Sequence, residues 1–426
     1  MTQIFVEESH ALPLVSVVVS FRSGSAHDPA GKEGLARATA RMLRRGADGL
    51  GANAIEERID SLGGDLATDT SVSSSSLHFE VIRRSLEPFS DLVATLLARP
   101  TFPTDELERL LRESQAELVE ARDSDRALAA RALRRTLFDG HPYGRRVSGT
   151  IASLGTIVRD DVEACYRRHF TRANALVAVA GDVTQAEGAA LAEKLLVGLA
   201  EGEAIADPVP PPAARPGRRL VIVDKADRTQ TQMVVGGLGT EAHDPDHVAL
   251  QVAITAFGGT FTSRLMQEIR AKRGWSYGAS ARAGVDRRRE AFTLWTAPAT
   301  GDAAACLGLE LELLHTLRAD GVTQEELDFV KKYLVRSHAF EIDTARKRVH
   351  QKLETALYDL PAGYHDRHVE HVLAVDRASA NEAVRLRVPE DDLVIAVVAT
   401  NAELGAKLAQ AIPGLAEVSV LPFDFE

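Results

Sequence analysis

The sequence predicts an α+β protein made of two tandem homologous domains, each a largely antiparallel sheet with helices packed on one face. Three observations support this prediction. The chain has 426 residues, which is too long for one typical hydrophobic core and suits two domains of about 200 residues each. A proline-rich stretch lies near the middle of the chain. The same order of apolar runs and helical patterns occurs on both sides of it.

The proline-rich stretch is PVPPPAARP, residues 208–216. Proline lacks a backbone N–H and favours extended conformations, so we expect a linker at 208–218. The boundaries that follow are an N-terminal domain at 1–207 and a C-terminal domain at 219–426.

Three pairs of similar segments indicate an internal duplication. Ala-His-Asp-Pro follows an apolar strand and precedes a helix at Ala26–Pro29 and again at Ala242–Pro245. Downstream, DELERLLRESQAEL from Asp105 resembles EELDFVKKYLVRSHAF from Glu325. Near the end of each half, ALVAVAGDVTQAE resembles LVIAVVATNAEL, a strand leading into a helix. The spacing between partners stays nearly constant, which chance matches of short strings would not give.

Hydrophobic periodicity locates the main elements. Apolar or alternating runs predict strands at 15–19, 77–81 and 231–235. Apolar residues at three- and four-residue spacing predict long helices, and those between 107 and 138 are expected to cover the first sheet. Helices that come in runs, and do not alternate singly with strands, favour an antiparallel-dominated sheet.

Composition excludes several classes of function. The net charge of −11 argues against a nucleic-acid partner, which needs a concentrated basic face. No apolar run reaches membrane-spanning length, and the first residues lack the pattern of a signal peptide. The two cysteines, Cys165 and Cys306, show no metal-binding or disulfide spacing. We expect a cytoplasmic protein, or a periplasmic one if an export signal was removed.

Two segments stand out chemically. The first clear helix, GLARATARMLRRG at 34–46, places arginines beside its apolar face. In the second half, AFGGTFTSRLMQEIRAKRGWSY spans 256–277, and Gly258–Gly259 predicts a flexible turn before an amphipathic helix. Arg270 near the end of that helix and Tyr277 on the next strand can converge on one point. A guanidinium and a phenol are both donors suited to a peptide carbonyl or its oxyanion.

Over essentially the whole chain, these features resemble the pitrilysin and mitochondrial-processing-peptidase family of zinc peptidases. In active members, HxxEH on the first helix supplies two zinc-binding histidines and the glutamate that activates water. The matching positions here are Arg37, Ala40 and Arg41, so the resemblance implies a degenerate zinc motif. The third zinc ligand of the family, a glutamate on a later helix, corresponds to Glu117. Arginine has no lone pair for a metal.

The block at 256–277 resembles the family's substrate-holding segment. The resemblance implies that Arg270 and Tyr277 hold substrate beside the zinc, with Gly258 and Gly259 in the same substrate-binding segment. It therefore implies a chain with no catalytic residue, metal or cofactor of its own. The zinc would lie in a partner subunit of similar length that carries HxxEH.

The function expected from this resemblance is that of the non-catalytic subunit of a heterodimeric zinc endopeptidase acting on unfolded peptides. Two alternatives stay open: a scaffold or binding subunit of a larger assembly, and a hydrolase with another metal site built on Glu117. Retention of Arg270 and Tyr277 favours the first function, because a scaffold has no use for them. We also expect Arg37 or Arg41 to pair with Glu117 in a buried pocket. Arg270 and Tyr277 are expected to line the face that meets the partner chain, inside a cavity.

Overall fold

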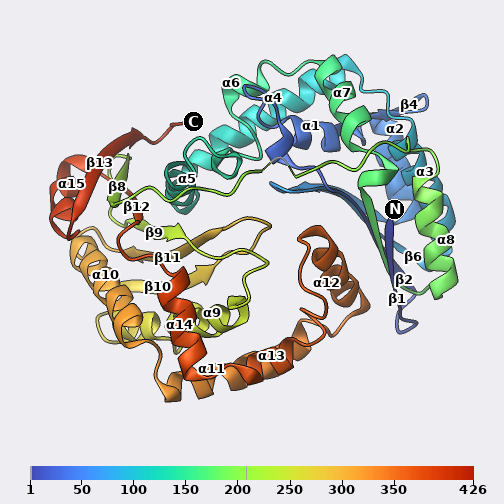
Figure 1. Cartoon of the computed structure of the whole chain (residues 1–426). Helices are drawn as coiled ribbons and strands as arrows, with labels where there is room; N and C mark the ends of the chain where they lie inside the picture. Colours follow the sequence, from blue (N-terminus) through green and yellow to red (C-terminus); the bar gives the residue numbers. More distant parts are fainter. Residues whose placement is uncertain (1, 208) are drawn as a thin grey trace. The chain divides into compact units, whose positions relative to one another are not determined.

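Figure 1 shows the computed structural model, which describes residues 2–207 and 209–426. The predicted linker begins at position 208, which lies outside the described residues, and 210–216 contain no helix or strand. The chain divides into two compact units. The N-terminal unit contains Met1–Leu118, Arg145–Val209 and Phe340–Leu357, and the C-terminal unit contains Val119–Gly144, Pro210–Ala339 and Tyr358–Glu426.

The N-terminal unit is built on a five-stranded sheet with the order β1-β7-β2-β6-β5. The β1–β7 pair is parallel, and the other three pairs are antiparallel. Its strands are β1 (Gln3–Glu8), β2 (Leu14–Phe21), β5 (Asp65–Thr70), β6 (Ser75–Ile82) and β7 (Ala175–Gly181), beside a short hairpin of β3 (Gly46–Ala47) and β4 (Leu50–Gly51).

The C-terminal unit is built on a six-stranded sheet with the order β10-β11-β9-β12-β8-β13. Three pairs are antiparallel, and the β12–β8 and β8–β13 pairs are parallel. Its strands are β8 (Arg218–Asp224), β9 (Gln232–Leu238), β10 (Ser276–Ala283), β11 (Ala291–Pro298), β12 (Val394–Ala399) and β13 (Leu415–Pro422).

The two sheets share one topology. Read from β8, the second sheet runs β8-β12-β9-β11-β10, which matches β1-β7-β2-β6-β5 strand for strand, and β13 is added at the edge. This agreement supports the duplication inferred from the paired segments. The predicted α+β class with two homologous domains is confirmed, and each sheet is mixed, with antiparallel pairs in the majority.

In the N-terminal unit, most helices cover one face of the sheet. They are α1 (Leu35–Met42), α2 (Ala52–Leu62), α3 (Leu86–Ala98), α4 (Thr104–Glu120), α6 (Ile151–Leu154), α7 (Arg159–His169) and α8 (Gln185–Leu196). One helix from the second half of the chain, α12 (Ala345–Leu357), packs against β1 and β7 on the opposite face from α8 (Figure 1). Because both faces of β7 are covered, its first six residues are all buried.

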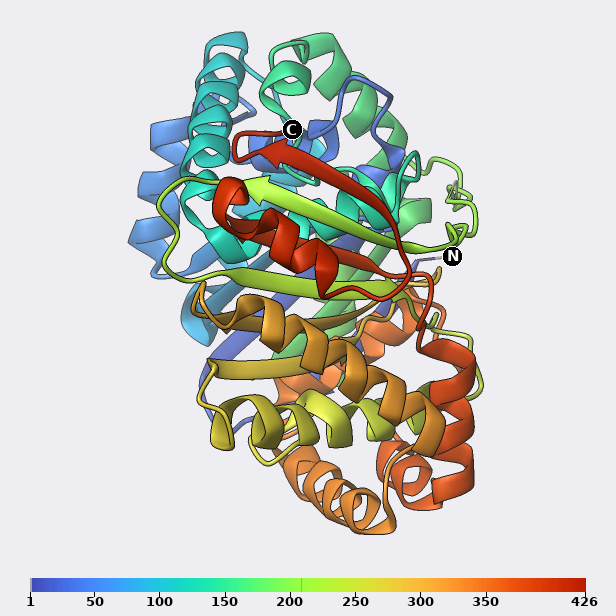
Figure 2. The same cartoon turned by 90° about the vertical axis from the view of Figure 1, so that its left-hand side faces the viewer.

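The C-terminal unit repeats this arrangement. Figure 2 shows α10 and α15 over one face of its sheet. The other face receives α5 (Asp125–Leu137), which packs against β9 and β12. The remaining helices are α9 (His247–Ile254), α10 (Ala303–Asp320), α11 (Gln324–Ser337), α13 (His368–Ala374), α14 (Arg377–Arg387) and α15 (Asn401–Gln410).

The exchanged helices correct two details of the prediction. Helices are not confined to one face of each sheet, because α5 and α12 cover the second faces. The helices between 107 and 138 also do not all cover the first sheet, since α5 packs on the sheet of the other half. Local periodicity shows that a helix has an apolar face but not which sheet will bury it.

The aspartate of the repeated Ala-His-Asp-Pro motif accepts hydrogen bonds that hold a loop in each half. Asp28 is buried, and its carboxylate accepts hydrogen bonds from the backbone N–H groups of Gly34 and Ala36, both at 2.8 Å. These bonds satisfy two free donors at the start of α1. In the second half, Asp244 accepts hydrogen bonds from the Thr240 hydroxyl at 2.8 Å and the Glu241 N–H at 3.0 Å. Each aspartate thus organises the loop between a strand and the helix that follows it, α1 in the first case and α9 in the second.

Candidate functional site: a filled ligand triangle and an unpaired arginine

Helix α1 lies with its apolar face in the core of the N-terminal unit. Leu35, Ala38, Thr39 and Met42 are all buried, as the periodicity predicts. Ala40, which the resemblance aligns with the family's catalytic glutamate, is only 2% exposed and belongs to the hydrophobic core. The arginines lie along the edge of this buried face.

Arg37 and Arg41 converge on Glu117 of α4. The Arg37 Nη2–Glu117 Oε2 distance is 2.9 Å, and the Arg41 Nη2–Glu117 Oε1 distance is 3.0 Å. Arg41 also donates to the Ser114 hydroxyl at 3.0 Å, one turn earlier on α4. The expected ion pair between Glu117 and the two arginines is therefore present, and both carboxylate oxygens are occupied.

The electrostatics of Glu117 follow from these contacts. Burial alone would raise its pKa, but the hydrogen bonds and charges of Arg37 and Arg41 outweigh that effect and hold the pKa below its ordinary value of 4.5. The side chain of Glu117 is 43% exposed, and that of Arg37 is 30% exposed. The expectation of a buried pair is therefore wrong, and its stabilisation is that of a solvent-screened network, about 1 kcal/mol or less per pair.

The other two arginines of the segment are also neutralised. Arg44 pairs with Glu56 at 2.7 Å, and Arg45 pairs with Glu113 at 2.7 Å and Glu106 at 3.3 Å. All four arginines of residues 37–45 therefore have carboxylate partners within the same unit. The segment looks strongly basic in the sequence because the carboxylates that pair with its arginines lie far away along the chain.

The donor set at this position does not suit zinc. Of the four groups that the resemblance assigns to the family's ligands and base, two are guanidinium groups and one is a methyl group. Only Glu117 could bind a metal, and its oxygens already accept from the arginines. The string HxxEH does not occur anywhere in the sequence.

The second segment, at 256–277, folds differently from its prediction. Gly258 and Gly259 do not form a flexible turn, because they close a π-helical segment, η6 (Thr255–Gly259), that extends α9. Gly258 is buried against β10, where a Cβ atom would lie 2.4 Å from the Ala281 nitrogen. It therefore allows close packing of the helix on the strand. Gly259 is exposed.

The amphipathic helix and the following strand agree with the prediction. Leu265, Met266 and Ile269 are buried, and residues 266–271 form a second π-helical segment, η7 (Met266–Ala271). Gly274 then has a φ of 65°, in the left-handed region that favours glycine, and β10 begins at Ser276. Short π-helical segments are frequent at functional sites.

Arg270 and Tyr277 do converge, together with a third residue. The Arg270 guanidinium carbon lies 4.8 Å from the centre of the Tyr277 ring and 4.2 Å from the centre of the Phe261 ring. Such contacts hold a cation by its attraction to the negative ring faces. Sequence reasoning missed Phe261, although a single aromatic residue in the polar turn GGTFTS is a signal that could have identified it.

Arg270 differs from the other cations of its segment. Arg264 pairs with Glu326 at 2.7 Å, and Lys272 and Arg273 both pair with Glu268. No described carboxylate lies within ion-pair distance of Arg270, and its Nη1 is buried without a hydrogen-bond partner. The guanidinium thus retains a free donor in a fixed position.

Tyr277 is 84% exposed and Phe261 is 70% exposed, so the two rings lie on the surface of the isolated chain. The cavity expected at the face that meets a partner chain stays a prediction. Exposed aromatic rings beside an unpaired arginine have the composition of a contact surface. The arrangement can donate hydrogen bonds to a carbonyl group supplied from outside.

Comparisons with known proteins agree with this architecture. The family model described as insulinase (peptidase family M16) matches residues 3–151, and the model described as the peptidase M16 inactive domain matches residues 156–334. An uncharacterized zinc protease of Mycobacterium leprae is 30% identical over 333 residues, 77% of this chain and 74% of that protein. A non-peptidase homolog of Helicobacter pylori is 23% identical over 397 residues, 93% of this chain and 91% of the homolog.

Solved structures share the fold. A peptidase M16 inactive domain from Pseudomonas fluorescens superposes with a TM-score of 0.87 at 24% identity, covering 93% of this chain and 95% of that chain. A chain of Complex III2 from Candida albicans gives 0.78 at 13% identity, covering 96% and 99%. The two matching models, the Mycobacterium relative and the duplicated fold together show that this chain belongs to the M16 (insulinase and pitrilysin) peptidase family.

Proposed function

We propose that this chain is the non-catalytic, zinc-less subunit of a heterodimeric zinc endopeptidase. Its partner is an M16 chain of similar length that carries HxxEH and the zinc ion. This chain supplies Arg270 and Tyr277, which bind the unfolded peptide substrate and stabilise the oxyanion formed during cleavage in the partner's site. The observation that carries the proposal is the unpaired Arg270 guanidinium held between two aromatic rings.

The N-terminal unit supports the proposal that this chain has no catalytic zinc site of its own. A catalytic zinc site needs three protein ligands and a water-activating base. Arg37 and Arg41 instead place positive charge near Glu117, where the metal's charge lies in an active member. The positive charges of Arg37 and Arg41 thus balance the negative charge of Glu117 without a metal ion.

The C-terminal unit supports the role in substrate binding. The other cations of the segment form ion pairs with carboxylates of this chain, whereas Arg270 has no described carboxylate partner. Tyr277 is exposed beside the Arg270 guanidinium, so its hydroxyl and the accessible part of that guanidinium can donate to the same group. Two convergent donors are what a developing oxyanion needs.

One alternative is favoured by a specific comparison. The similar chain in Complex III2 belongs to a larger assembly, so a scaffold or binding subunit derived from a peptidase is the second candidate function. A scaffold would not depend on the Tyr277 hydroxyl. The two candidates therefore differ in one measurable property.

The test is turnover by a reconstituted heterodimer. The chain is mixed with an HxxEH-bearing M16 partner, and cleavage of an unfolded peptide is measured. Tyr277→Phe removes one donor but keeps the ring that holds Arg270, so we expect turnover to fall about 10²–10³-fold. Arg270→Lys should also impair turnover, because lysine lacks the planar fork of donors.

The matched control is Arg273→Lys, three residues further on. Arg273 pairs with Glu268 within the chain, so its replacement should leave turnover nearly unchanged. Complex formation, followed by size-exclusion chromatography, should be the same for all three variants. Wild-type turnover in both Tyr277→Phe and Arg270→Lys would reject the proposal and favour the scaffold.

A further inference from the structure

A pocket in the C-terminal unit, separate from the Arg270 segment, contains an unusual number of arginines. Its volume is about 210 Å3. The lining residues come from several elements of the unit: the end of α5, the segment leading into β8 and the start of that strand, the end of β9, the residues before β11, α10, and the end of α14 with its following loop. The side chains that give it its charge are Arg215, Arg219, Arg289, Arg318, Arg387 and Asp392.

Three of the five arginines are neutralised by carboxylates of the same unit. Arg215 pairs with Asp139 at 3.2 Å, Arg318 pairs with Glu390 at 3.2 Å, and Arg387 pairs with Asp244 and Asp246 at 2.9 Å each. These three guanidinium groups are therefore held in place by contacts that do not need a bound molecule.

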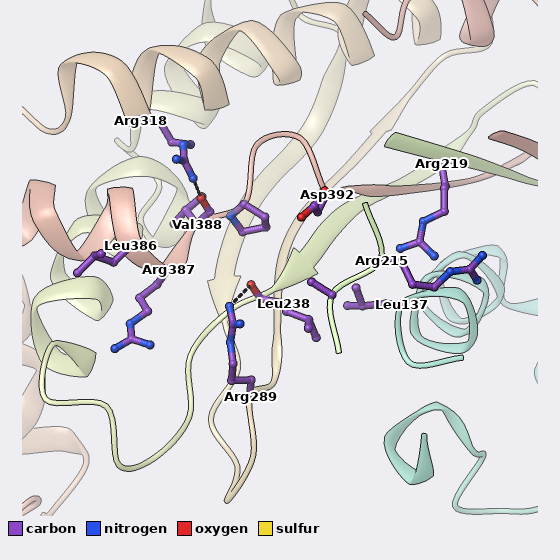
Figure 3. Close-up of a pocket in the computed structure, with 12 residues that line it drawn as sticks. Leu137, Arg215, Arg219, Leu238, Arg289, Arg318, Leu386, Arg387, Val388 and Asp392 are labelled. Atoms are coloured by element: carbon purple, nitrogen blue, oxygen red, sulfur yellow. Dashed lines mark hydrogen bonds between the residues drawn. The ribbon is translucent and has the colours of Figure 1, made fainter. Parts of the chain in front are cut away.

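The other two arginines have no carboxylate within ion-pair distance among the described residues. Arg289 donates to the backbone carbonyls of Gly239 at 3.0 Å and Leu238 at 3.2 Å. Arg219 donates to the Thr136 carbonyl at 3.1 Å, and its Nε has no partner. Figure 3 shows Arg289 and Arg318 approaching the pocket from opposite sides, and Arg219 extending from its strand toward Arg215.

Arg219 is the more unusual of the two. It is only 4% exposed, in a strand that lies between β12 and β13. A buried cation without a paired anion is costly, and the nearby Arg215 adds repulsion. Burial and the charge of Arg215 lower the pKa of Arg219, and the charges of Glu417, Asp392 and Asp139 offset only part of this effect.

Asp392, the only acidic residue lining the pocket in the described part of the chain, does not pair with either Arg219 or Arg289. Asp392 accepts a hydrogen bond from the Gly217 N–H at 3.0 Å, which ties its carboxylate to the start of β8. Two unpaired guanidinium groups and one carboxylate leave a net positive charge at the pocket. Arginine forks bind the paired oxygens of phosphate and carboxylate groups.

We propose that this pocket binds a small oxyanion, a phosphate or carboxylate group, through the arginines that line it. The volume suits a molecule of a few heavy atoms, since one water takes about 30 Å3 of liquid volume. The site is independent of the substrate-binding role proposed above and lies on different elements. Binding there would relieve the repulsion between Arg215 and Arg219, so it should stabilise the C-terminal unit.

The test uses the purified full chain with inorganic phosphate and with succinate, each compared with chloride at equal ionic strength. Thermal unfolding and isothermal titration calorimetry measure stability and binding. We expect saturable binding of one anion per chain and a rise in melting temperature that chloride does not give. Phosphate and succinate separate the two chemical sources of the oxyanion. Saturation by either one supports the site.

Two variants assign the binding to these arginines. Arg219→Met and Arg289→Met should each weaken binding by about tenfold or more, and Arg219→Met should raise the melting temperature of the anion-free chain. Arg385→Met is the control, because Arg385 lies on α14 beside the pocket, is exposed and pairs with Glu382 at 2.6 Å. If Arg219→Met does not fold, Arg289→Met still decides the question.

Two results would overturn the proposal. The first is no saturable binding of phosphate or succinate at millimolar concentration. The second is binding that both pocket variants retain at the affinity of the wild type and of Arg385→Met, which would place the anion elsewhere.

Discussion

Glu310 offers a quantitative test of the packing in the C-terminal unit. It lies on α10, is fully buried, and neither of its carboxylate oxygens has a hydrogen-bond partner among the described residues. Burial raises its pKa from 4.5 to about 8, and the nearby Thr296 hydroxyl offsets only part of that rise. In the folded protein at neutral pH, this carboxyl group is therefore mostly protonated.

The sign of the effect on stability follows from linkage. The folded state holds the proton more tightly than the unfolded chain, so the free energy of unfolding falls as pH rises from 4.5 to about 8 and then levels off. Each tenfold change in proton affinity corresponds to about 1.4 kcal/mol, so the loss is about 3 kcal/mol at pH 7. It approaches 5 kcal/mol, as an upper bound, above pH 8.

Glu310→Gln removes the titrating group while keeping its shape. The variant should match the wild type near pH 4 and become more stable by several kcal/mol at pH 8–9. Both tryptophans of the chain, Trp275 and Trp295, lie in the C-terminal unit. Tryptophan fluorescence during urea unfolding therefore reports on the unit that contains the mutation.

The matched control is Glu312→Gln, on the same helix but exposed. It should change stability by no more than about 0.5 kcal/mol. A stability difference between Glu310→Gln and the wild type that stays constant from pH 4 to 9 would refute the reasoning.

The remaining predictions concern α1 and its surroundings. Glu117→Gln should lower stability by only about 1 kcal/mol, because the network is half exposed, and a loss above 3 kcal/mol by circular dichroism would contradict this. Combined Arg37→His, Ala40→Glu and Arg41→His should not restore one zinc per chain in metal analysis, since position 40 is 2% exposed and leaves no room for glutamate. Asp28→Ala should cost about 1–2 kcal/mol by removing the acceptor at the start of α1, whereas Asp28→Asn, which keeps an acceptor, should cost less.

Sequence reasoning succeeded where local pattern determines structure. The buried face of α1, the strand at 15–19 and the glycine that ends the helix before Tyr277 all follow from periodicity or from backbone freedom. The duplication can be recognised in the sequence because Ala-His-Asp-Pro occurs in the equivalent loop of each half, where its aspartate accepts hydrogen bonds that hold the loop. The pairing of Arg37 and Arg41 with Glu117 was expected because the family's ligand positions converge.

Other features depend on contacts between distant segments. Helix α5 comes from the first half of the chain and packs on the second sheet, and α12 comes from the second half and packs on the first sheet. The local sequence does not reveal this exchange, because an apolar helix face is compatible with either sheet. The pairing of Arg45 with Glu106 and Glu113 also needs the tertiary fold. Phe261 and the arginine pocket were missed since a lone aromatic residue and scattered arginines gain meaning only when the fold gathers them.

One comparison tests the non-catalytic role most directly: the zinc content of the isolated chain and of the heterodimer, measured by mass spectrometry after dialysis. None of the helices among the described residues has the length and apolarity that a membrane span requires. The account predicts no stoichiometric zinc and no peptide cleavage for the isolated chain. It predicts one zinc per heterodimer with an HxxEH-bearing partner. One tightly bound zinc in the isolated chain, with proteolysis that a chelator abolishes, would contradict it.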